Sequence, residues 1–150
     1  MTETPDTLSV LMIDDDEEDI YTMRRAFQEA DRSITFKSMA DNTPIFAEEF
    51  DPRTYDADVV ILDLNMPIFS GYETLRRIRN GPNPSLVPIV VLSTSAATSD
   101  ARRCYAGGAN AVFTKASSFE YTKQIAQAIS GFWRTPGIRV IKETATVSPS

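Results

Sequence analysis

The stretch Asp58–Pro67, which reads DVVILDLNMP, constrains the fold more than any other part of the chain. Val59–Leu62 are branched apolar residues in unbroken succession, and the carboxylate of Asp63 follows them. A short apolar run bounded by polar and turn residues is typical of a strand buried on both faces, as in a parallel sheet. Asp63 should then lie where the strand leaves the core, at the edge where open α/β sheets bind ligands. Taken alone, Asp63 could equally cap the next turn.

The remaining segments alternate between short apolar runs and helical patterns. Further strands are predicted at Leu8–Ile13, Ile34–Ala40, Pro88–Leu92 and Ala111–Thr114. Helices are predicted up to Ala30, from Asn42 with Ile45, Phe46 and Phe50 as apolar contacts, from the Ser70 cap to Arg79, from the Ser99 cap to Ala106, and over Ser118–Trp133 with Tyr121, Ile125, Ala128, Ile129 and Phe132 on the inner face. This alternation with short connections predicts an α/β fold in which helices cover both faces of a parallel sheet.

Length and charge narrow the function classes. A chain of 150 residues is most simply one domain, and its net charge of −6 argues against partners such as nucleic acid or anionic lipid. The start of the chain lacks the pattern of a secretory signal, and the sequence contains no apolar run long enough for a membrane span, so a cytoplasmic protein is expected. One cysteine, Cys104, and no histidine exclude an internal disulfide and the usual zinc sites.

Chemically active side chains stand at the ends of the predicted strands. Asp14 and Asp15 follow the first strand, and Asp63, Ser93 and Lys115 end three others. In a parallel sheet all of these meet at one edge. Crowded carboxylates raise one another's pKa unless a cation neutralises them, and oxygen ligands of this kind suit Mg²⁺. With a hydroxyl and an ammonium beside them, they form a cradle for a phosphoryl group, with a carboxylate as nucleophile.

These residues and their spacing resemble the receiver domains of two-component response regulators. The spacings from Asp63 to Ser93 and from Ser93 to Lys115 are those of chemotaxis-type receivers. The resemblance covers residues 8–133 as the receiver domain and leaves residues 134–150 as a C-terminal extension. It implies a flavodoxin-like, doubly wound (βα)5 fold whose five-stranded parallel sheet has the order 2-1-3-4-5.

The resemblance also implies a role for each site residue. Asp63 would be the phosphoacceptor, and Mg²⁺, or Mn²⁺ in its place, would be the cofactor. The implied metal ligands are Asp15, Asp63, the backbone carbonyl of Asn65 and, through a water, Asp14, while Ser93, Thr94 and Lys115 would contact the phosphoryl group. The implied function is that of a single-domain response regulator in a phosphorelay, a signalling protein and not an enzyme, with a sensor histidine kinase as its partner.

Three alternatives compete with this interpretation. One is a degenerate receiver that acts as a phosphorylation-independent interaction module. A second is a Mg²⁺-dependent phosphohydrolase with an aspartyl-phosphate intermediate, since Asp14 and Asp16 match its D-x-D arrangement superficially. The third, an EF-hand calcium loop on the acidic run, is rejected because Asp19 occupies the position that requires glycine.

Three positions depart from the family pattern. Ala116 follows Lys115 where many receivers have a proline with a cis bond. Val112 occupies the position of the usual aromatic switch residue, and strand alternation should point the neighbouring Phe113 to the other face. Ser93 replaces the commoner threonine and keeps the hydroxyl. The usual coupling of hydroxyl to aromatic is therefore expected to be absent or rerouted.

Several features resemble the single-domain regulators that partner bacterial and cyanobacterial phytochrome kinases. They are Ser93-Thr94-Ser95, Lys115 without a following proline, the acidic first loop, and Phe132-Trp133 before a short tail. The family implies a kinase-docking surface on the first helix, for which the candidates are Ile20, Met23, Arg24 and Phe27, although their spacing would equally suit core packing. Residues 134–150 are too few for a DNA-binding effector domain, and Gly137–Ile141 could form an arm of a homodimer or a frayed end. Phe132 and Trp133 are more often core anchors of a last helix than an exposed contact site, and the end of a helix suits either role.

Overall fold

The computed structural model describes residues 7–115 and 118–139. Ala116 and residues 140–150, on which two of the predictions depend, lie outside this range. In chain order the elements are β1 (Leu8–Ile13), α1 (Glu17–Ala30), β2 (Ile34–Met39), the 3₁₀ turns η1 (Thr43–Phe46) and η2 (Pro52–Tyr55), β3 (Val59–Asp63), α2 (Gly71–Asn80), β4 (Ile89–Ser93), α3 (Thr98–Ala106), β5 (Ala111–Thr114) and α4 (Phe119–Trp133). The strands pair in parallel in the order β2-β1-β3-β4-β5, which confirms the predicted topology.

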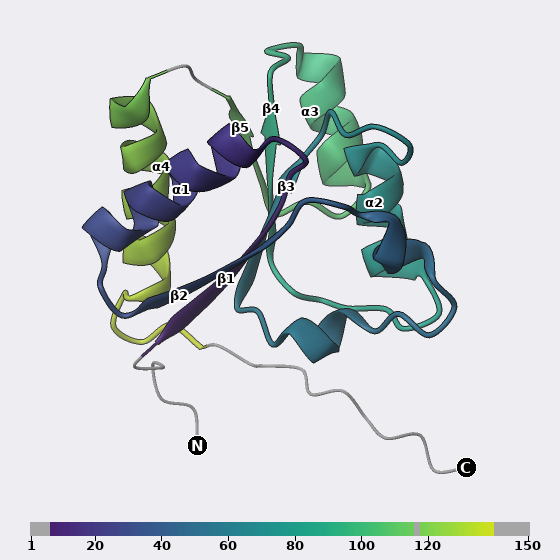
Figure 1. The fold of residues 1–150 in the computed structure, drawn as a ribbon, viewed down its shortest axis with the longest axis horizontal. Helices are drawn as coiled ribbons and strands as arrows, with labels where there is room; N and C mark the ends of the chain where they lie inside the picture. The colour runs from purple at the N-terminus through teal and green to yellow at the C-terminus, as the bar shows by residue number, and fades with distance from the viewer. Residues whose placement is uncertain (1–6, 116–117, 140–150) are drawn as a thin grey trace.

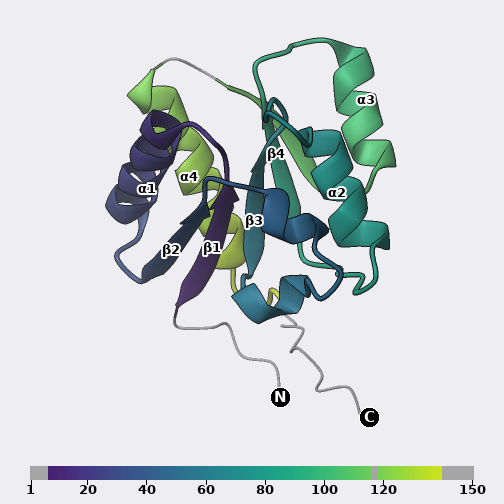
Figure 2. The same ribbon diagram turned by 45° about the vertical axis from the view of Figure 1, so that its right-hand side comes forward.

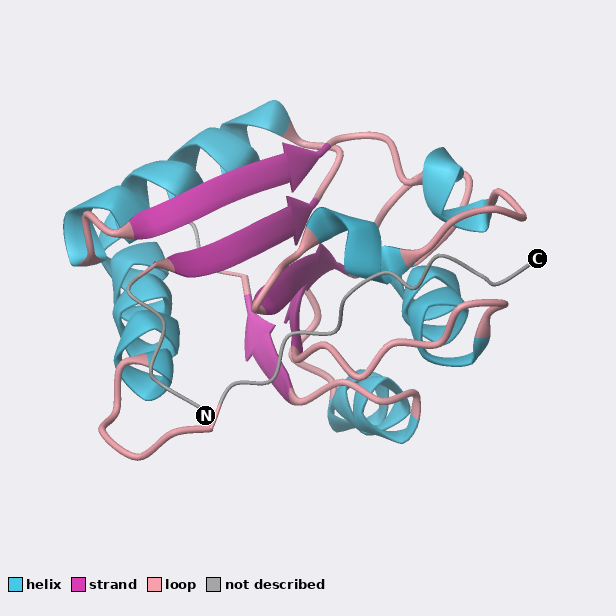
Figure 3. Cartoon of the chain, turned by 90° about the horizontal axis from the view of Figure 1, so that it is seen from below, coloured by secondary structure: helices cyan, strands magenta, loops and turns pink. Residues whose placement is uncertain are grey.

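The sheet forms the middle layer, with a hydrophobic cluster on each face. Helices α1 and α4 lie side by side on one face, and η1, α2 and α3 cover the other (Figures 1 and 2). Seen from below, helices flank the strands on both sides (Figure 3). All of β3 is buried, with Val59 and Ile61 in the α1–α4 cluster and Val60 and Leu62 in the other. The uninterrupted apolar run therefore reflects a strand covered on both faces.

One of the predicted helix caps is confirmed and another is wrong, and α1 has a cap that was not predicted. Ser70 caps α2 in a complete capping box with Glu73, as predicted. Asp16 caps α1 by accepting a hydrogen bond from the Glu18 N–H at 2.9 Å. The prediction that Ser99 caps the next helix was wrong, because α3 starts at Thr98 and its N-cap position is Ala97.

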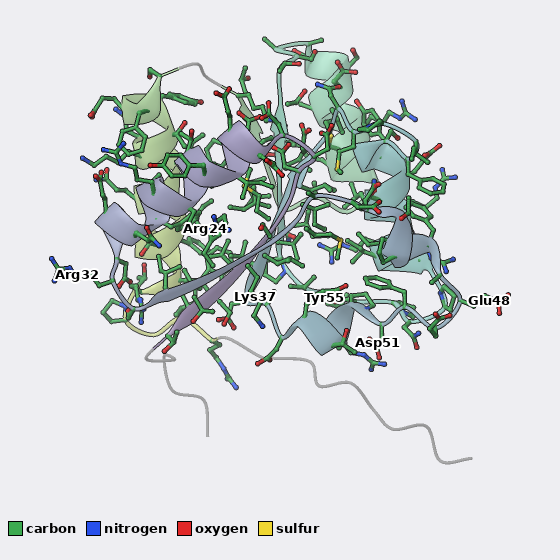
Figure 4. All side chains as sticks on the ribbon, viewed as in Figure 1. Arg24, Arg32, Lys37, Glu48, Asp51 and Tyr55 are labelled. Atoms are coloured by element: carbon green, nitrogen blue, oxygen red, sulfur yellow. The ribbon has the colours of Figure 1, made fainter. Side chains whose placement is uncertain are left out.

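The connection between β2 and β3 contains the 3₁₀ turn η1 where a helix start was predicted, followed by η2 in the segment that carries Asp51 and Tyr55 (Figure 4). Pro44 and Pro52 lie in the first turns of η1 and η2, where the missing N–H of a proline is tolerated. Arg77 of α2 stabilises η1 by donating to its last carbonyls, with Nε 3.1 Å from Ile45 O and Nη2 2.8 Å from Ala47 O. A cavity of about 490 Å³ lies beside this crossover.

The inner face of α4 differs from the predicted one by a shift around the helix. Ile125 and Ile129 are buried as predicted, but the adjacent buried residue is Ala126, while Ala128 is exposed. Phe132 is 60% exposed, so the prediction that it lies on the inner face of the helix was wrong, and of its two suggested roles the exposed one agrees with the structure. None of the helices in the described ranges combines the length and the hydropathy needed to cross a lipid bilayer.

Candidate functional site

The carboxyl ends of four strands bring the predicted site residues together. Asp14 follows β1 directly, Asp63 and Ser93 end β3 and β4, and Lys115 follows β5. The strand register places Asp63 opposite Leu92, so neighbouring strands end at nearly the same level. The Lys115 N–H donates to the Ser93 carbonyl at 2.6 Å, which fixes the start of the loop after β5 against β4.

Three carboxylates form a cluster at this edge. One oxygen from each of Asp14, Asp15 and Asp63 lies within 4.8 Å of the others. Asp14 and Asp63 are 0% and 3% exposed, whereas Asp15 lies at the surface. The cluster can therefore hold a divalent ion between two buried carboxylates and the exposed carboxylate of Asp15. Asn65 lies in the adjoining loop, where its N–H donates to Asp63 Oδ1 at 3.3 Å.

Asp16 does not join this cluster. Its carboxylate is used as the cap of α1 and lies at the surface. The D-x-D arrangement that suggested a phosphohydrolase therefore has only its first member in the site.

Lys115 neutralises part of the negative charge. Its Nζ lies 3.0 Å from Asp14 Oδ2, 2.7 Å from Asp19 Oδ2 and 3.2 Å from Asp63 Oδ1. Burial lowers the pKa of Lys115, but the hydrogen bond to Asp19 and the charges of Asp14 and Asp63 outweigh it and raise the pKa above the ordinary value. Lys115 is thus a fixed cation at the site.

The pKa of Asp14 is raised from 3.8 to about 6. Burial of the carboxyl is the main cause, and the charge of Asp63 adds to it. The hydrogen bond from the Asp16 N–H and the charge of Lys115 act in the opposite direction. Burial thus disfavours the charged form of Asp14, and a bound divalent ion would favour that form.

Asp19 was not predicted as a site residue. It lies in the first turn of α1, and its carboxylate makes the shortest contact with Lys115. Its spacing of one helical turn from Asp15 was the available signal.

The two predicted hydroxyls occupy different environments. Ser93 is buried, and its Oγ accepts a hydrogen bond from the Ser95 N–H at 3.1 Å. Thr94 is exposed, and its Oγ1 accepts a hydrogen bond from the Asn65 side-chain amide at 2.8 Å. Thr94 therefore ties the loop after β4 to the loop after β3.

The loop between β3 and α2 is held by residues that the sequence did not single out. Asn42, which is buried, donates its side-chain N–H to the Phe69 carbonyl at 2.8 Å and to Thr74 Oγ1 at 3.1 Å. Phe69 stacks on Phe46 of η1 with ring centroids 3.7 Å apart. In the same loop Ile68 is 79% exposed and has a φ of 66°, a left-handed conformation that is unfavourable for a β-branched residue.

Val112 occupies the position of the usual aromatic switch residue, and the prediction that Phe113 points to the other face of the sheet is confirmed. Val112 packs with the α2–α3 cluster and Phe113 with the α1–α4 cluster, so the two point to opposite faces. The Val112 N–H donates to the Tyr105 hydroxyl at 3.2 Å.

The candidate docking surface on α1 requires a correction. Ile20, Met23 and Phe27 are 6%, 3% and 0% exposed and belong to the core cluster against the sheet. Arg24 is placed between α1 and β2, with its guanidinium over the Phe36 ring (Figure 4). These three side chains therefore pack α1 against the sheet and are not at the surface, whereas Arg24 is partly exposed.

Known proteins match both the sequence and the fold. The model of the response regulator receiver domain matches residues 10–128. The chain is 36% identical over 83 residues to the probable methanogenesis regulatory protein FilR2 of Methanothrix harundinacea, covering 53% of this chain and 54% of that protein. It is 33% identical over 76 residues to the response regulator Rcp1 of Synechocystis, covering 51% and 52%. The chain thus spans about half the length of the curated relatives it matches.

Solved structures share the whole arrangement. The crystal structure of the phosphorylated cyanobacterial phytochrome response regulator RcpA superimposes with a TM-score of 0.75 at 26% identity, covering 89% of this chain and 98% of that one. A response regulator from Hahella chejuensis gives a TM-score of 0.72 at 25% identity, covering 88% and 98%. The match of the family model to most of the chain, together with the acidic cluster and Lys115, shows that the chain belongs to the response regulator receiver domain family, whose members are phosphoacceptor signalling domains.

Proposed function

We propose that this chain is a response regulator receiver that accepts a phosphoryl group on Asp63 from a sensor histidine kinase. The observation that carries the proposal is the position of Asp63 between the acidic cluster and Lys115, at the carboxyl edge of the sheet. Phosphoryl transfer asks a protein chiefly to position the nucleophile and to neutralise the charge of the transferred group. The residues around Asp63 meet both requirements.

The transfer step uses the chain's own residues as follows. A carboxylate oxygen of Asp63 attacks the phosphorus of a phosphohistidine, an O–P bond forms, and the N–P bond breaks with its electron pair going to the imidazole nitrogen, which takes up a proton. Asp15, Asp63 and the Asn65 carbonyl, with Asp14 acting through a water, would hold Mg²⁺, or Mn²⁺ in its place, and the bound ion would neutralise phosphoryl oxygens. Lys115 would pair with another of these oxygens.

The hydroxyls of Ser93 and Thr94 would then bind the phosphoryl group on Asp63. Ser93 lies beside Asp63 at the end of the neighbouring strand, and its hydroxyl would donate to a phosphoryl oxygen once it turns toward Asp63. Thr94, one residue on, would contribute at the exposed side of the group. The acyl phosphate would add negative charge and acceptor oxygens at the sheet edge, which is the local change that biases a two-state switch.

We propose that the donor kinase is of the phytochrome type. The support is the likeness to RcpA and to Rcp1, together with the Ser93-Thr94-Ser95 sequence and the residue after Lys115. Since histidine kinases draw their phosphoryl group from ATP, the reaction would take place in the cytoplasm. A phosphotransfer assay with a panel of purified kinases tests the choice of donor, and equal rates from unrelated kinases would contradict it.

A homodimer is also proposed, through the end of α4 and the extension that follows. The support is Phe132, which is 60% exposed beside Trp133 at the helix end. Light scattering with and without phosphorylation measures the mass, and a monomer in both states would contradict the proposal.

The experiment that tests the proposed function is intact mass spectrometry after incubation with acetyl phosphate. The wild type should gain one phosphoryl group only when Mg²⁺ is present, and hydroxylamine should remove it, as expected for an acyl phosphate. Asp63→Asn should gain none, while the matched control Asp41→Asn, in an exposed loop, should behave as the wild type. A full adduct on Asp63→Asn, or none on the wild type, would contradict the proposal, and the second result would favour a degenerate receiver.

A further inference from the structure

The loop after β4 starts a chain of hydrogen bonds that leads away from the site. Ser93 Oγ accepts from the Ser95 N–H at 3.1 Å, and the Ser95 hydroxyl donates to Asp100 Oδ2 at 2.6 Å. The hydroxyl of Tyr72 donates to the other oxygen of Asp100 at 3.1 Å, and the Arg103 guanidinium lies 3.7 Å from the centre of the Tyr72 ring. This series of hydrogen bonds connects the buried Ser93 hydroxyl with α3 and then with α2.

The charges fix the direction of these bonds. The hydrogen bonds from Ser95 and then from Tyr72 lower the pKa of Asp100, while burial and then the bond to Asp100 raise the pKa of Tyr72. At neutral pH Asp100 is therefore an ionised acceptor between two hydroxyl donors. Hydrogen bonds to an ionised partner are stronger than those between neutral groups. A shift of Ser95 should therefore move Asp100 and, through it, Tyr72.

The loop after β4 is also hydrogen-bonded to the loop after β3, which carries Asn65. The Asn65 amide donates to Thr94 Oγ1 at 2.8 Å, while Ser95 Oγ accepts from the Ala97 N–H at 3.1 Å. The side chains of Thr94 and Ser95 therefore hold the loop between Asn65, two residues after Asp63, and Asp100 in the first turn of α3. A movement of Ser93 toward Asp63 has to change one or both of these ties.

Strand β5 lacks the aromatic side chain that usually changes its rotamer when the hydroxyl moves. Val112 has no ring to rotate, and its N–H is bonded to the Tyr105 hydroxyl. The path through Ser95 is instead built from hydrogen bonds: the Ser95 main-chain N–H contacts Ser93, and side chains make the two bonds that follow.

We propose that Ser95, Asp100 and Tyr72 are positioning residues that set where the Ser93 hydroxyl lies and that carry its movement to the contact between α2 and α3. The inference rests on the proposed function. When a phosphoryl oxygen at Asp63 captures the Ser93 hydroxyl, Ser93 Oγ leaves the Ser95 N–H, and the bonds from Ser95 to Asp100 and from Tyr72 to Asp100 rearrange. The first turns of α2 and α3 then form the face that distinguishes the phosphorylated protein.

The test combines two readouts on variants of the full chain. Intact mass gives the rates of phosphorylation by acetyl phosphate with Mg²⁺ and of hydrolysis after its removal. Amide hydrogen exchange with and without phosphorylation follows Gly71–Asn80 and Thr98–Ala106. The variants are Tyr72→Phe and Ser95→Ala, with Ser95→Thr as the conservative rescue, and Tyr105→Phe is the control because it removes a ring hydroxyl on the β5 side.

In the wild type, phosphorylation should change exchange in the first turns of both helices. In Tyr72→Phe, Asp63 should still be phosphorylated, but the response in α2 should be lost. Ser95→Ala should lose the response in both helices and change the phosphorylation or hydrolysis rate by about fivefold, the factor that one ordinary hydrogen bond contributes. Ser95→Thr should restore both readouts, and Tyr105→Phe should match the wild type.

Three results would overturn the inference while leaving the proposed function intact, and the first two concern the response of α2 and α3. One is a phosphorylated wild type without any change in α2 and α3, and the other is an unchanged response in Tyr72→Phe and Ser95→Ala. A loss of response in Tyr105→Phe would assign the path to β5 and also overturn it. Failure of the wild type to form the Asp63 adduct is a different pattern, and it would refute the proposed function together with the inference.

Discussion

Replacing Asp14 by asparagine should stabilise the metal-free protein, although Asp14 belongs to the site. The carboxyl is 0% exposed and shares the edge of the sheet with Asp15 and Asp63. Asparagine keeps the shape and the oxygen that accepts from the Asp16 N–H at 2.9 Å. It removes a charge that the folded protein holds unfavourably when no divalent ion is bound.

The pKa of Asp14 gives the size of the effect. It is raised from 3.8 to about 6, and each unit corresponds to about 1.4 kcal/mol, so the ionised carboxylate costs about 3 kcal/mol of folding free energy at neutral pH. The attraction of Lys115 is already included in this shift. We therefore expect Asp14→Asn to raise the free energy of unfolding by about 2–3 kcal/mol in EDTA. With an m-value of about 2 kcal/mol/M, the urea midpoint should rise by about 1 M.

The sign of the pH dependence follows from the raised pKa. Between pH 3.8 and about 6 the folded protein binds more protons at Asp14 than the unfolded chain does, so this contribution to stability decreases as pH rises through that window. The wild type should show this component and Asp14→Asn should lack it.

Urea unfolding in EDTA and in Mg²⁺ measures these effects. Mg²⁺ at ten times its dissociation constant should stabilise the wild type by about 1.4 kcal/mol and the variant by much less. The reasoning about the crowded carboxylates would be refuted if Asp14→Asn unfolded at the same or a lower urea concentration than the wild type in EDTA.

Three further variants test the surroundings of the site. Arg77→Met should lower the free energy of unfolding by about 2–3 kcal/mol in urea unfolding, because it removes charged hydrogen bonds to the carbonyls of η1, whereas the exposed Arg76→Met should have little effect. Gly71→Ala would place a Cβ 2.5 Å from a backbone atom of the loop after β3, so thermal unfolding should show a loss of about 2 kcal/mol or more, and equal stability would contradict the close approach. Gly131→Ala, where nothing lies within 4 Å, should instead stabilise the helix by about 1 kcal/mol. Ile68→Gly should raise the melting temperature by relieving a φ of 66°, a gain of about 1 kcal/mol, and a lower melting temperature would show that Ile68 makes compensating contacts.

The strands and their ends could be predicted because the signal is local and strong. Val59–Leu62 needed both faces covered, and Asp63 had to emerge at the end of that strand. The parallel topology then brought Asp14, Ser93 and Lys115 to the same edge without further information. The apolar run thus determined the site through the geometry of the sheet.

Other features depend on contacts between distant segments. The sequence from Asn42 to Phe50 has apolar residues at helical spacing, but Arg77 and the stacked rings of Phe46 and Phe69 stabilise a 3₁₀ turn instead. The apolar face of α1 has the same spacing whether it docks a partner or packs on the sheet, and only the position of α4 beside it settles the burial. The bonds from Ser95 to Asp100 and from Tyr72 to Asp100 join three segments, so no single stretch of sequence indicated them.

The 3₁₀ crossover between β2 and β3 has a consequence for how the chain tolerates extra residues. Glu48 and Glu49 form an exposed turn between η1 and η2, and Glu48 lies at the outer edge of the molecule (Figure 4). The site residues all come from other segments, and Arg77 holds η1 before this turn begins. A lengthened turn leaves the sheet pairing as it is, and loop entropy grows only slowly with length. A second domain could therefore be inserted at Glu48–Glu49 without displacing the strand ends, which makes this crossover the natural place to fuse a reporter to the receiver.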